Sequence, residues 1–246
     1  MSDRVALVTG ASSGIGAAIA RRLAMDGYSV LAAGRNAGRT SALSDELPSV
    51  RSWVGNLAAS PDCDQLVAAC LKEFGGLDVL VNNAGIWQPV TTEETTDRIW
   101  LDTLAINLNI PFFLSRAALP YLQQRKGAIV NIASSWGLHG APQAAAYCAS
   151  KGGLVLMTRA MSIDHASQGV RINAVCPGDV ATPMLFRDAE AQGIDRESAL
   201  REANAGSRSG RITMPEEVAA LVAFLASEAA AQINGAAIPI DGGELA

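Results

Sequence analysis

The stretch VALVTGASSGIG, residues 5–16, decides the fold of this chain. It begins with the apolar run 5–8, which is typical of a strand buried on both faces of a parallel sheet. Gly10, Gly14 and Gly16 follow, and glycine permits a tight turn in which the backbone approaches a ligand closely. The helix that begins there presents its N-terminus to any phosphate group bound at the turn. This order of strand, glycine-rich turn and helix predicts the first unit of a dinucleotide-binding sheet.

Similar apolar runs recur along the chain and alternate with helical patterns. Strands are expected at residues 5–9, 29–33, 50–54, 78–82, 128–133, 171–176 and 236–240. Helices are expected at residues 15–26, 61–74, 98–124, 146–167 and 215–226. The alternation predicts an α/β fold: a Rossmann-type, doubly wound parallel sheet of about seven strands with helices on both faces. No linker, repeat or low-complexity segment interrupts the pattern, so residues 1–246 are expected to form one domain.

The composition argues against several classes of protein. Hydrophobic residues make up 49% and charged residues 17% of the 246, which favours a large, well-covered core over disorder. A net charge of -5 argues against a nucleic-acid partner, and no run approaches the ~18 apolar residues of a membrane span. The N-terminus leads directly into the first strand, so no signal peptide is expected. The four cysteines lack CxxC spacing and only two histidines are present, so we expect no metal site, reduced thiols and a cytoplasmic location.

The end of the second expected strand indicates which dinucleotide is preferred. An NAD site usually places an acid there, roughly 20 residues beyond the glycines, to bind the ribose 2′-hydroxyl. This chain instead has Gly34 followed by Arg35 and Asn36. Because an arginine favours a 2′-phosphate, NADP(H) is the expected cofactor and NAD(H) is the alternative. Arg35 also fits the role of a solvated loop residue.

A second pattern points to proton chemistry. Tyr147 and Lys151 are four residues apart in an expected helix, so their side chains share one face. A phenol has an ordinary pKa of about 10, and a fixed ammonium beside it favours the phenolate and lowers that pKa toward the working range. Taken alone, the pair also fits an ordinary contact on a helix surface. Ser134 lies thirteen residues before Tyr147.

With the glycine turn ahead of Ser134, Tyr147 and Lys151, the chain resembles the short-chain dehydrogenase/reductase family over nearly its whole length. Further motifs of that family occur in the expected order: Asn82-Asn83-Ala84-Gly85, Ile106-Asn107-Leu108, Pro177-Gly178-Asp179-Val180-Ala181-Thr182 and Asp241-Gly242-Gly243. The resemblance implies an NAD(P)(H)-dependent oxidoreductase that interconverts a ketone or aldehyde and an alcohol. It also implies a homo-tetramer.

The resemblance assigns catalytic roles to Asn107, Ser134, Tyr147 and Lys151. Tyr147 would be the general acid/base, and Lys151 would bind the nicotinamide ribose and keep Tyr147 partly ionised. Ser134 would steady the oxygen on which charge develops; it is chosen over Ser135 because the family's serine lies thirteen residues before its tyrosine. Asn107 would anchor a water that links Lys151 to solvent.

The resemblance also implies a set of cofactor-binding residues. At the glycine turn these are Gly10, Ser12, Ser13, Gly14, Ile15 and Gly16. After the next strands they are Arg35, Asn36, Asn56, Leu57, Asn83, Ala84 and Gly85. Around the nicotinamide they are Tyr147, Lys151, Pro177, Gly178, Val180 and Thr182. Asn56 stands where many relatives have aspartate, and its amide oxygen can still accept a hydrogen bond.

The substrate side is expected to be an apolar pocket with one titratable histidine. Its candidate residues are Ser134, Trp87, Trp136, His139, Tyr147, Met184 and Phe186. Ser134 and Tyr147 are also catalytic candidates, whereas each of the other side chains fits ordinary packing as well. His139 fits either a second proton donor or a residue with a structural role at the rim of the pocket. The polar segment 183–210 is expected to be a substrate lid or an ordinary surface excursion, and its arginines either meet an anionic substrate or lie in solvent.

These patterns leave several functions to compare, all with a small-molecule partner. The leading hypothesis is a reductase of carbonyl compounds or 3-oxoacyl thioesters, which the chain resembles. The alternative within the family is a sugar, polyol or hydroxy-acid dehydrogenase that works in the oxidative direction. A non-catalytic dinucleotide-binding sensor or scaffold is the alternative from another class, and the complete catalytic set argues against it. An epimerase or dehydratase is disfavoured by the compact length and the glycine spacing.

Overall fold

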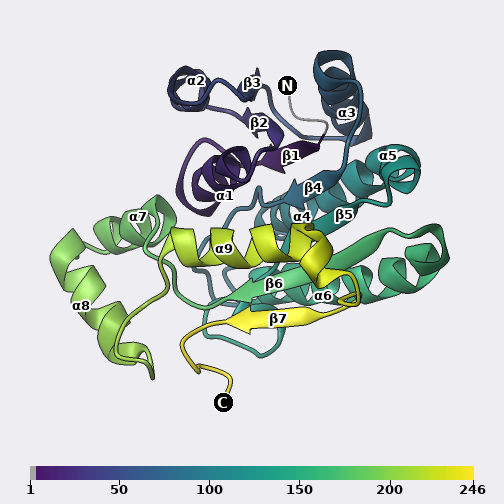
Figure 1. Ribbon diagram of the computed structural model, residues 1–246. Coiled ribbons are helices and arrows are strands. Elements are labelled where there is room, and N and C mark those ends of the chain that lie inside the picture. The colour runs from purple at the N-terminus through teal and green to yellow at the C-terminus, as the bar shows by residue number, and fades with distance from the viewer. Residues whose placement is uncertain (1–3) are drawn as a thin grey trace.

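The computed structural model describes residues 4–246. Residues 1–3 lie outside the described part, so the signal-peptide expectation is not tested where it rests on them. One parallel sheet has the strand order β3-β2-β1-β4-β5-β6-β7. The strands are β1 (Val5–Thr9), β2 (Ser29–Gly34), β3 (Val50–Val54), β4 (Val79–Asn82), β5 (Ala128–Ile132), β6 (Arg171–Pro177) and β7 (Ala237–Ile240). The prediction of a doubly wound parallel sheet of about seven strands is confirmed (Figure 1).

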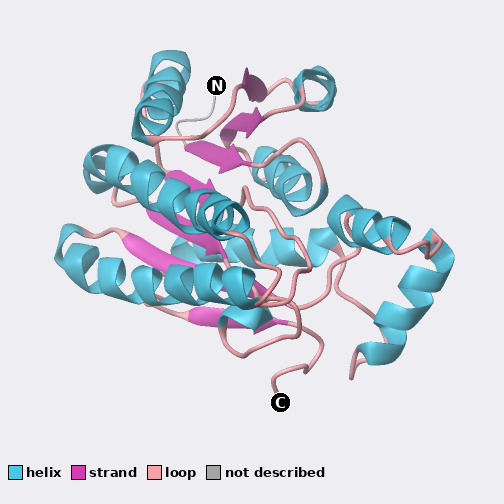
Figure 2. Cartoon of the chain, turned by 180° about the vertical axis from the view of Figure 1, so that it is seen from behind, coloured by secondary structure: helices cyan, strands magenta, loops and turns pink. Residues whose placement is uncertain are grey.

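Helices cover both faces of the sheet. One layer consists of α1 (Gly14–Met25), α2 (Ala37–Glu46) and α9 (Pro215–Ala226). The opposite layer consists of α3 (Ser60–Phe74), α5 (Ile110–Arg125) and α6 (Ala145–His165). Figure 1 shows α1 and α9 in front of the sheet, and Figure 2 shows α5 and α6 from the other side. The sheet is therefore enclosed between two helical layers.

The strands alternate their side chains between these layers, as the pleat requires. In β1, Ala6 and Val8 pack toward α1 and α9, whereas Val5 and Leu7 pack toward α3 and α5. All four side chains are buried. Because both faces of each central strand are covered, these strands need continuous apolar runs, and such runs are visible in the sequence.

The strand order reverses between β1 and β4, and this reversal positions the site. From β1 the chain continues to β2 and β3 on one side of the sheet, whereas β4 to β7 extend on the other. The connections therefore diverge above the carboxyl ends of β1 and β4. In open α/β sheets, ligands bind in the crevice that forms at such a switch point.

A buried polar network fixes α6 against the strands that carry the site. The Asn82 side-chain amide donates to Asn131 Oδ1 at 2.8 Å, and the Asn131 amide donates to Thr158 Oγ1 at 2.8 Å. Thr158 in turn donates to the Leu154 carbonyl at 2.8 Å. These bonds join β4 and β5 to α6, so the side chains of α6 have a defined position relative to the strand ends.

Two expected segments differ in the structure. The helix expected over residues 98–124 is divided into α4 (Asp97–Leu104), a π-helical turn η1 (Ala105–Asn109) and α5. The segment 183–210 is largely helical: α7 (Pro183–Ala191) and α8 (Arg196–Gly206) project from the side of the sheet (Figure 1). Short helices η2 (Ser135–Gly137), η3 (Ala166–Gln168) and η4 (Glu228–Ala230) complete the chain. None of the described helices combines the length and the apolar character that crossing a bilayer requires.

Candidate functional site

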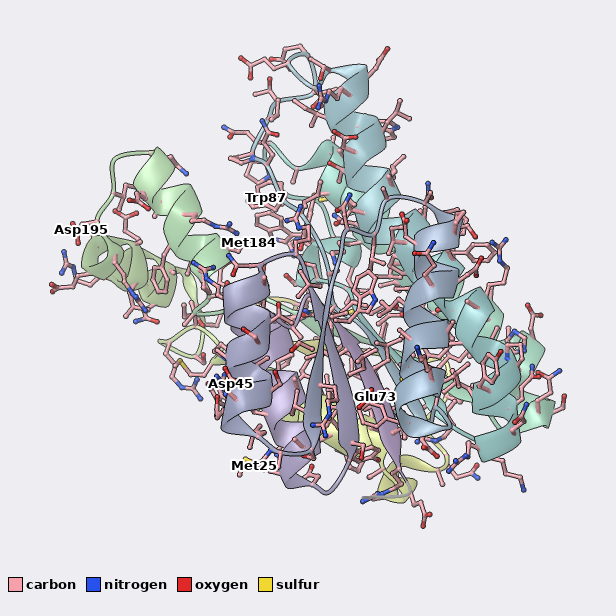
Figure 3. All side chains as sticks on the ribbon, turned by 90° about the horizontal axis from the view of Figure 1, so that it is seen from above. Met25, Asp45, Glu73, Trp87, Met184 and Asp195 are labelled. Carbon is pink, nitrogen blue, oxygen red and sulfur yellow. The ribbon has the colours of Figure 1, made fainter. Side chains whose placement is uncertain are left out.

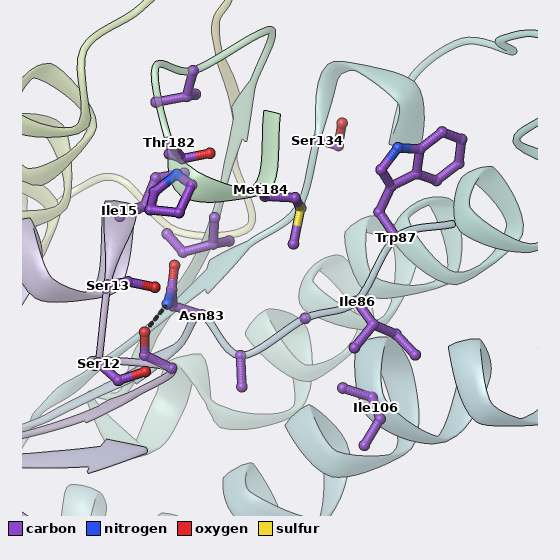
Figure 4. Close-up of a pocket in the computed structure, with 18 of the residues that line it drawn as sticks. Ser12, Ser13, Ile15, Asn83, Ile86, Trp87, Ile106, Ser134, Thr182 and Met184 are labelled. Atoms are coloured by element: carbon purple, nitrogen blue, oxygen red, sulfur yellow. Dashed lines mark hydrogen bonds between the residues drawn. The ribbon is translucent and has the colours of Figure 1, made fainter. Parts of the chain in front are cut away.

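A cavity of about 650 Å³ opens above the carboxyl ends of the strands, at the switch point. This volume lies within the range of small-molecule and cofactor sites. Figure 4 shows Ser12 and Ser13 at one end of the cavity, and Trp87 and Ser134 at the other. Figure 3 shows Trp87 and Met184 close together where α7 approaches the rest of the chain. The cavity thus extends from the glycine turn to the region expected to hold the substrate.

The glycine turn has no room for larger residues. Gly10 and Gly14 have φ of 65° and 55°, in the left-handed region that glycine adopts most readily. A Cβ at Gly10 would lie 2.8 Å from Asn83 Nδ2, and one at Gly16 would overlap both the Gly10 carbonyl oxygen and the Asn83 amide. The turn therefore presents bare backbone at the start of α1, as close approach to a pyrophosphate requires. The residues present fit a dinucleotide.

Thr9 and Asn83 join the turn to the loop after β4. Thr9 Oγ1 accepts from the backbone amides of Asn83 at 3.0 Å and Ala84 at 3.1 Å. The Asn83 side-chain amide donates to the carbonyls of Thr9 at 2.8 Å and Gly10 at 3.3 Å. Asn83, Ala84 and Gly85 line the cavity, although the Asn83 side chain is already bonded to the turn. These hydrogen bonds within the protein therefore fix the glycine turn and the loop after β4 relative to each other.

The end of β2 has no room for an acidic side chain. A Cβ at Gly34 would lie 2.6 Å from the Thr40 hydroxyl oxygen. Asn36 caps α2 by accepting from the Arg39 amide at 2.9 Å. Arg35, Asn36 and Arg39 all line this end of the cavity, and both arginines are exposed. Within residues 4–246 neither guanidinium is paired with a carboxylate, so both are available to an anionic group.

The loop after β3 supplies the next part of the wall. Asn56 and Leu57 line the cavity at the positions expected from the sequence. Trp53 lines it as well, and its ring lies so close to Gly55 that a Cβ there would overlap it. A flat aromatic surface at this end suits a purine ring.

Ser134, Tyr147 and Lys151 meet at the opposite end of the cavity. Ser134 follows β5, and Tyr147 and Lys151 occupy successive turns at the start of α6. Lys151 is buried, donates to the Ile132 carbonyl at 2.8 Å, and has its Nζ 5.7 Å from the centre of the Tyr147 ring. Ser134 Oγ accepts from the Trp136 amide at 3.2 Å. The i,i+4 spacing thus places the lysine and the phenol on the same side of α6, facing the cavity.

Asn107 lies in the π turn and joins two segments beside the cavity. Its Oδ1 accepts from the Ile86 amide at 2.8 Å, and its Nδ2 donates to the Ile86 carbonyl at 2.9 Å and to Ser150 Oγ at 3.1 Å. Ser150 Oγ donates to the Tyr147 carbonyl at 2.8 Å. The buried Asn107 side chain therefore connects the loop after β4 to the first turn of α6. Its expected role in anchoring a water stays a prediction.

Burial shifts both titratable groups of the site toward their neutral forms. It raises the pKa of Tyr147 to about 12, although a hydrogen bond with Ser134 offsets part of this effect. Burial also lowers the pKa of Lys151 to about 8. The sequence predicted that Lys151 would lower the pKa of Tyr147, whereas in the structure this pKa is raised. The reason is that desolvation of the phenol dominates, while the ammonium is bonded to the Ile132 carbonyl.

The segment after β6 closes the cavity over the glycine turn. Pro177, Gly178, Val180 and Thr182 all line the cavity. A Cβ at Gly14 would lie 3.2 Å from the methyl carbon of Thr182, so this segment and the turn are in near contact. The residues expected around the nicotinamide are therefore placed opposite those expected to bind the pyrophosphate.

Trp87, Trp136 and Met184 line the cavity near Ser134 and Tyr147, and the structure brings these five candidate substrate residues together. Trp87 comes from the loop after β4, Trp136 from η2 and Met184 from α7. The apolar wall expected on the substrate side is therefore built from three separate segments.

His139 and Phe186 do not belong to the residues that line the cavity. His139 Nε2 lies 3.3 Å from Glu244 Oε1, and its Nδ1 lies 2.8 Å from the Gly140 carbonyl oxygen. The Phe186 ring lies under the Arg196 guanidinium, 4.2 Å from its centre to Cζ. Both side chains thus have other partners, which the sequence did not reveal.

Several residues that line the cavity were not singled out from the sequence. They include Arg39, Trp53, Asp179, Leu185 and Arg187. Arg39 lies in the first turn of α2, just after the end of β2, and this position brings a second cation to the same end. Asp179 lies within a recognised motif, but nothing in the motif indicates that it reaches the cavity. Among residues 4–246, no group of three or more potential His, Cys, Asp or Glu metal ligands comes together.

Comparison with known proteins matches the family model for short chain dehydrogenases to residues 4–193. Among curated relatives, D-beta-hydroxybutyrate dehydrogenase of Cupriavidus necator is 36% identical over 100% of this chain and 99% of its own length. Meso-2,3-butanediol dehydrogenase of Serratia marcescens is 39% identical over 99% of this chain and 95% of its own. Among solved structures, a variant of actinorhodin polyketide ketoreductase with NADPH is 38% identical and superimposes with a TM-score of 0.93. The match covers 98% of this chain and 97% of the ketoreductase chain.

The raised pKa of Tyr147 predicts that its phenol stays protonated through the neutral and mildly alkaline range. With a pKa of about 12, about 1% of the phenol is ionised at pH ~10, where an ordinary tyrosine is half ionised. The phenolate ultraviolet band, titrated in the protein and in Tyr147→Phe, should therefore be the same in both up to about pH 10. A phenolate that titrates near neutral pH and is missing in the variant would contradict the raised pKa.

Proposed function

This chain belongs to the short-chain dehydrogenase/reductase family, whose members transfer hydride between NAD(P)(H) and a carbonyl or alcohol, and we propose that it reduces a ketone to a secondary alcohol with NADPH. One observation carries this proposal: Ser134, Tyr147 and Lys151 meet at one end of a cavity whose other end is the backbone of the glycine turn, and burial raises the pKa of the Tyr147 phenol. A neutral phenol in that position is a proton donor. The proton that the reduction consumes is therefore already on the residue that would deliver it.

The hydroxyls of Ser134 and Tyr147 act on the carbonyl oxygen of the substrate. Negative charge develops on that oxygen as the carbonyl carbon gains a hydride, and hydrogen bonds from the two hydroxyls stabilise it. Tyr147 then transfers its proton to the oxygen, so the C=O double bond becomes a C–O single bond, with one new C–H bond and one new O–H bond. NADPH, when bound, supplies the hydride and leaves as NADP⁺.

Lys151 supports the phenolate that Tyr147 becomes. Because its pKa is about 8, Lys151 is largely cationic at neutral pH and lies close enough to favour a negative charge on the tyrosine. Its ammonium has three donors, and the Ile132 carbonyl accepts from it at 2.8 Å. A second donor can therefore bind a ribose hydroxyl, the role expected from the resemblance.

The preference for NADPH rests on the adenine end of the cavity. Gly34 leaves no space for the acid that would bind a 2′-hydroxyl, while Arg35 and Arg39 offer two unpaired guanidinium groups. A 2′-phosphate is the anionic group that such a pair suits, since guanidinium forms charge-assisted bonds to phosphate oxygens. NAD(H) remains the alternative cofactor.

The segment α7–α8 fits the lid of the proposed enzyme. Met184, Leu185 and Arg187 reach the cavity from α7, so movement of α7 would open or close the substrate end. We also propose a cytoplasmic location, because the four cysteines are free thiols and suit a reducing compartment.

We further propose that the enzyme is a homo-tetramer, as the resemblance implies. Large apolar side chains are exposed on the layer formed by α4, α5 and α6. They include Trp100, Leu101, Phe112, Leu156 and Ile163. On α6, Leu156 and Ile163 are seven residues apart and therefore share one face, where they are 64% and 78% exposed. An apolar face of this kind is typical of a surface between subunits.

Replacing Tyr147 with phenylalanine should remove the proton donor while keeping the ring. The rate of ketone reduction should fall by about 10²–10⁴-fold, the usual contribution of a general acid, while the Kd for NADPH changes by less than about threefold. Steady-state NADPH consumption and fluorescence titration measure the two quantities, with Tyr121→Phe on α5 as the control. A variant that keeps its rate would refute the assignment. NADPH binding without turnover in the unaltered protein would favour a non-catalytic scaffold.

Replacing Arg35 and Arg39 with alanine should weaken NADPH more than NADH. Each charge-assisted bond to a phosphate contributes about 1.5–3 kcal/mol, so kcat/KM for NADPH should fall by roughly 10-fold or more per arginine. The value for NADH should stay within about threefold, because no 2′-phosphate is lost. Arg98→Ala, on the exposed side of α4, is the control. Equal losses with both cofactors would contradict the proposed role of the arginines.

Light scattering should give a particle of about four times the 25.5 kDa chain mass if the enzyme is a tetramer. A charge in the exposed apolar face should weaken association, so Ile163→Glu should shift the mass toward smaller species. Met25→Glu, at a similarly exposed position on α1, is the matched control and should leave the mass unchanged. A monomeric mass for the unaltered protein would contradict the proposal.

A further inference from the structure

Two tryptophans surround the proton-donating tyrosine. The ring centres of Trp87 and Tyr147 are 5.1 Å apart with planes at 66°, and those of Trp136 and Tyr147 are 6.0 Å apart at 89°. The two indoles also contact each other, at 5.2 Å and 74°. Each ring thus meets the next edge to face, an arrangement that aromatic rings favour. The three rings form one aromatic corner, which we call the Trp87–Trp136–Tyr147 corner.

This corner faces the cavity and has unused polar edges. All three rings are half-buried and line the cavity, and Figure 4 shows Trp87 at the end where Ser134 lies. Within the described residues, no hydrogen bond is formed by either indole N–H. A tryptophan N–H that is largely enclosed normally finds an acceptor. The corner therefore offers apolar ring surface to a ligand, with donors available at its edges.

The positive charges of the cavity lie elsewhere or have other partners. Arg35 and Arg39 line the adenine end. On the lid, Arg187 donates to the Pro183 carbonyl at 3.1 Å, and Arg196 lies over the Phe186 ring. Arg201 is bonded to Glu197 at 2.6 Å. Arg187 and Arg201 thus have partners within their own helices and Arg196 has one in α7, so the structure does not favour an anionic substrate bound by them.

We infer that the substrate of this enzyme is an aryl ketone, whose aromatic ring packs in the Trp87–Trp136–Tyr147 corner. The inference rests on the proposed function, because it names the substrate class of the same site. A flat ring packs against the faces and edges of the three aromatic rings while its carbonyl oxygen meets Ser134 and Tyr147.

Two ketones test the inference with NADPH. Acetophenone and cyclohexyl methyl ketone have similar size but differ in aromaticity. We expect kcat/KM for acetophenone to exceed that for the cyclohexyl ketone by at least about tenfold. A ratio close to one would overturn the inference and leave the proposed function standing. If no ketone of any kind is reduced, the proposed function is overturned as well.

Variants assign the ratio to the corner. Trp87→Leu and Trp136→Leu should lower the ratio between acetophenone and the cyclohexyl ketone toward one, whereas Phe224→Leu on the exposed side of α9 should not change it. An aromatic preference that survives both tryptophan variants would overturn the role of the corner.

Discussion

The site depends on a steric constraint: the turn after β1 and the loop after β4 are so close that no side chain fits at Gly10 or Gly16. A Cβ at Gly16 would overlap the carbonyl of Gly10 and the amide of Asn83, and one at Gly10 would lie 2.9 Å from the Ala84 backbone. The hydroxyl of Thr9 then bonds both amides of the loop. These strands are neighbours because the strand order reverses between them. The reversal thus both opens the crevice and fixes its floor, so little rearrangement is needed when a ligand binds.

Most of the fold could be predicted because its strands are buried on both faces and have unbroken apolar runs. The glycine turn and the shared face of Tyr147 and Lys151 were equally readable, since both follow from local geometry. The π turn at Ala105–Asn109 was not predicted, although Pro111 is a local signal for it, since proline cannot donate to the carbonyl of Asn107 four residues earlier. At this break the Asn107 side chain bonds Ile86 and Ser150, and these tertiary contacts could not be read from the local sequence.

The substrate side was predicted less completely for a related reason. Trp87, Trp136 and Met184 line the cavity, whereas His139 lies beside Glu244 near the C-terminus and Phe186 lies under Arg196. All five were chosen because they follow a recognised motif, but proximity in sequence does not determine the direction of a side chain. Partners from distant segments decided which side chains reach the cavity. The helices α7 and α8 were missed because polar, glycine-punctuated sequence gives little of the apolar periodicity that indicates a helix.

The two ends of the cavity use different chemistry. One end combines bare backbone amides with the exposed cations Arg35 and Arg39, which together suit phosphate groups. The other end has the rings of Trp87, Trp136 and Tyr147, and its lysine is buried beneath the wall. A ligand that is anionic along one half and apolar along the other therefore fits best in one orientation.

The pKa of Tyr147 connects this arrangement to the proton that the reaction moves. Burial raises that pKa to about 12, so the protonated phenol predominates at pH 7. A protonated phenol gives a proton in reduction, and the same group must first lose that proton to act as the base in oxidation. The cation of Lys151 favours the phenolate, but its effect on this pKa is smaller than that of burial. Burial therefore decides which form of the phenol predominates.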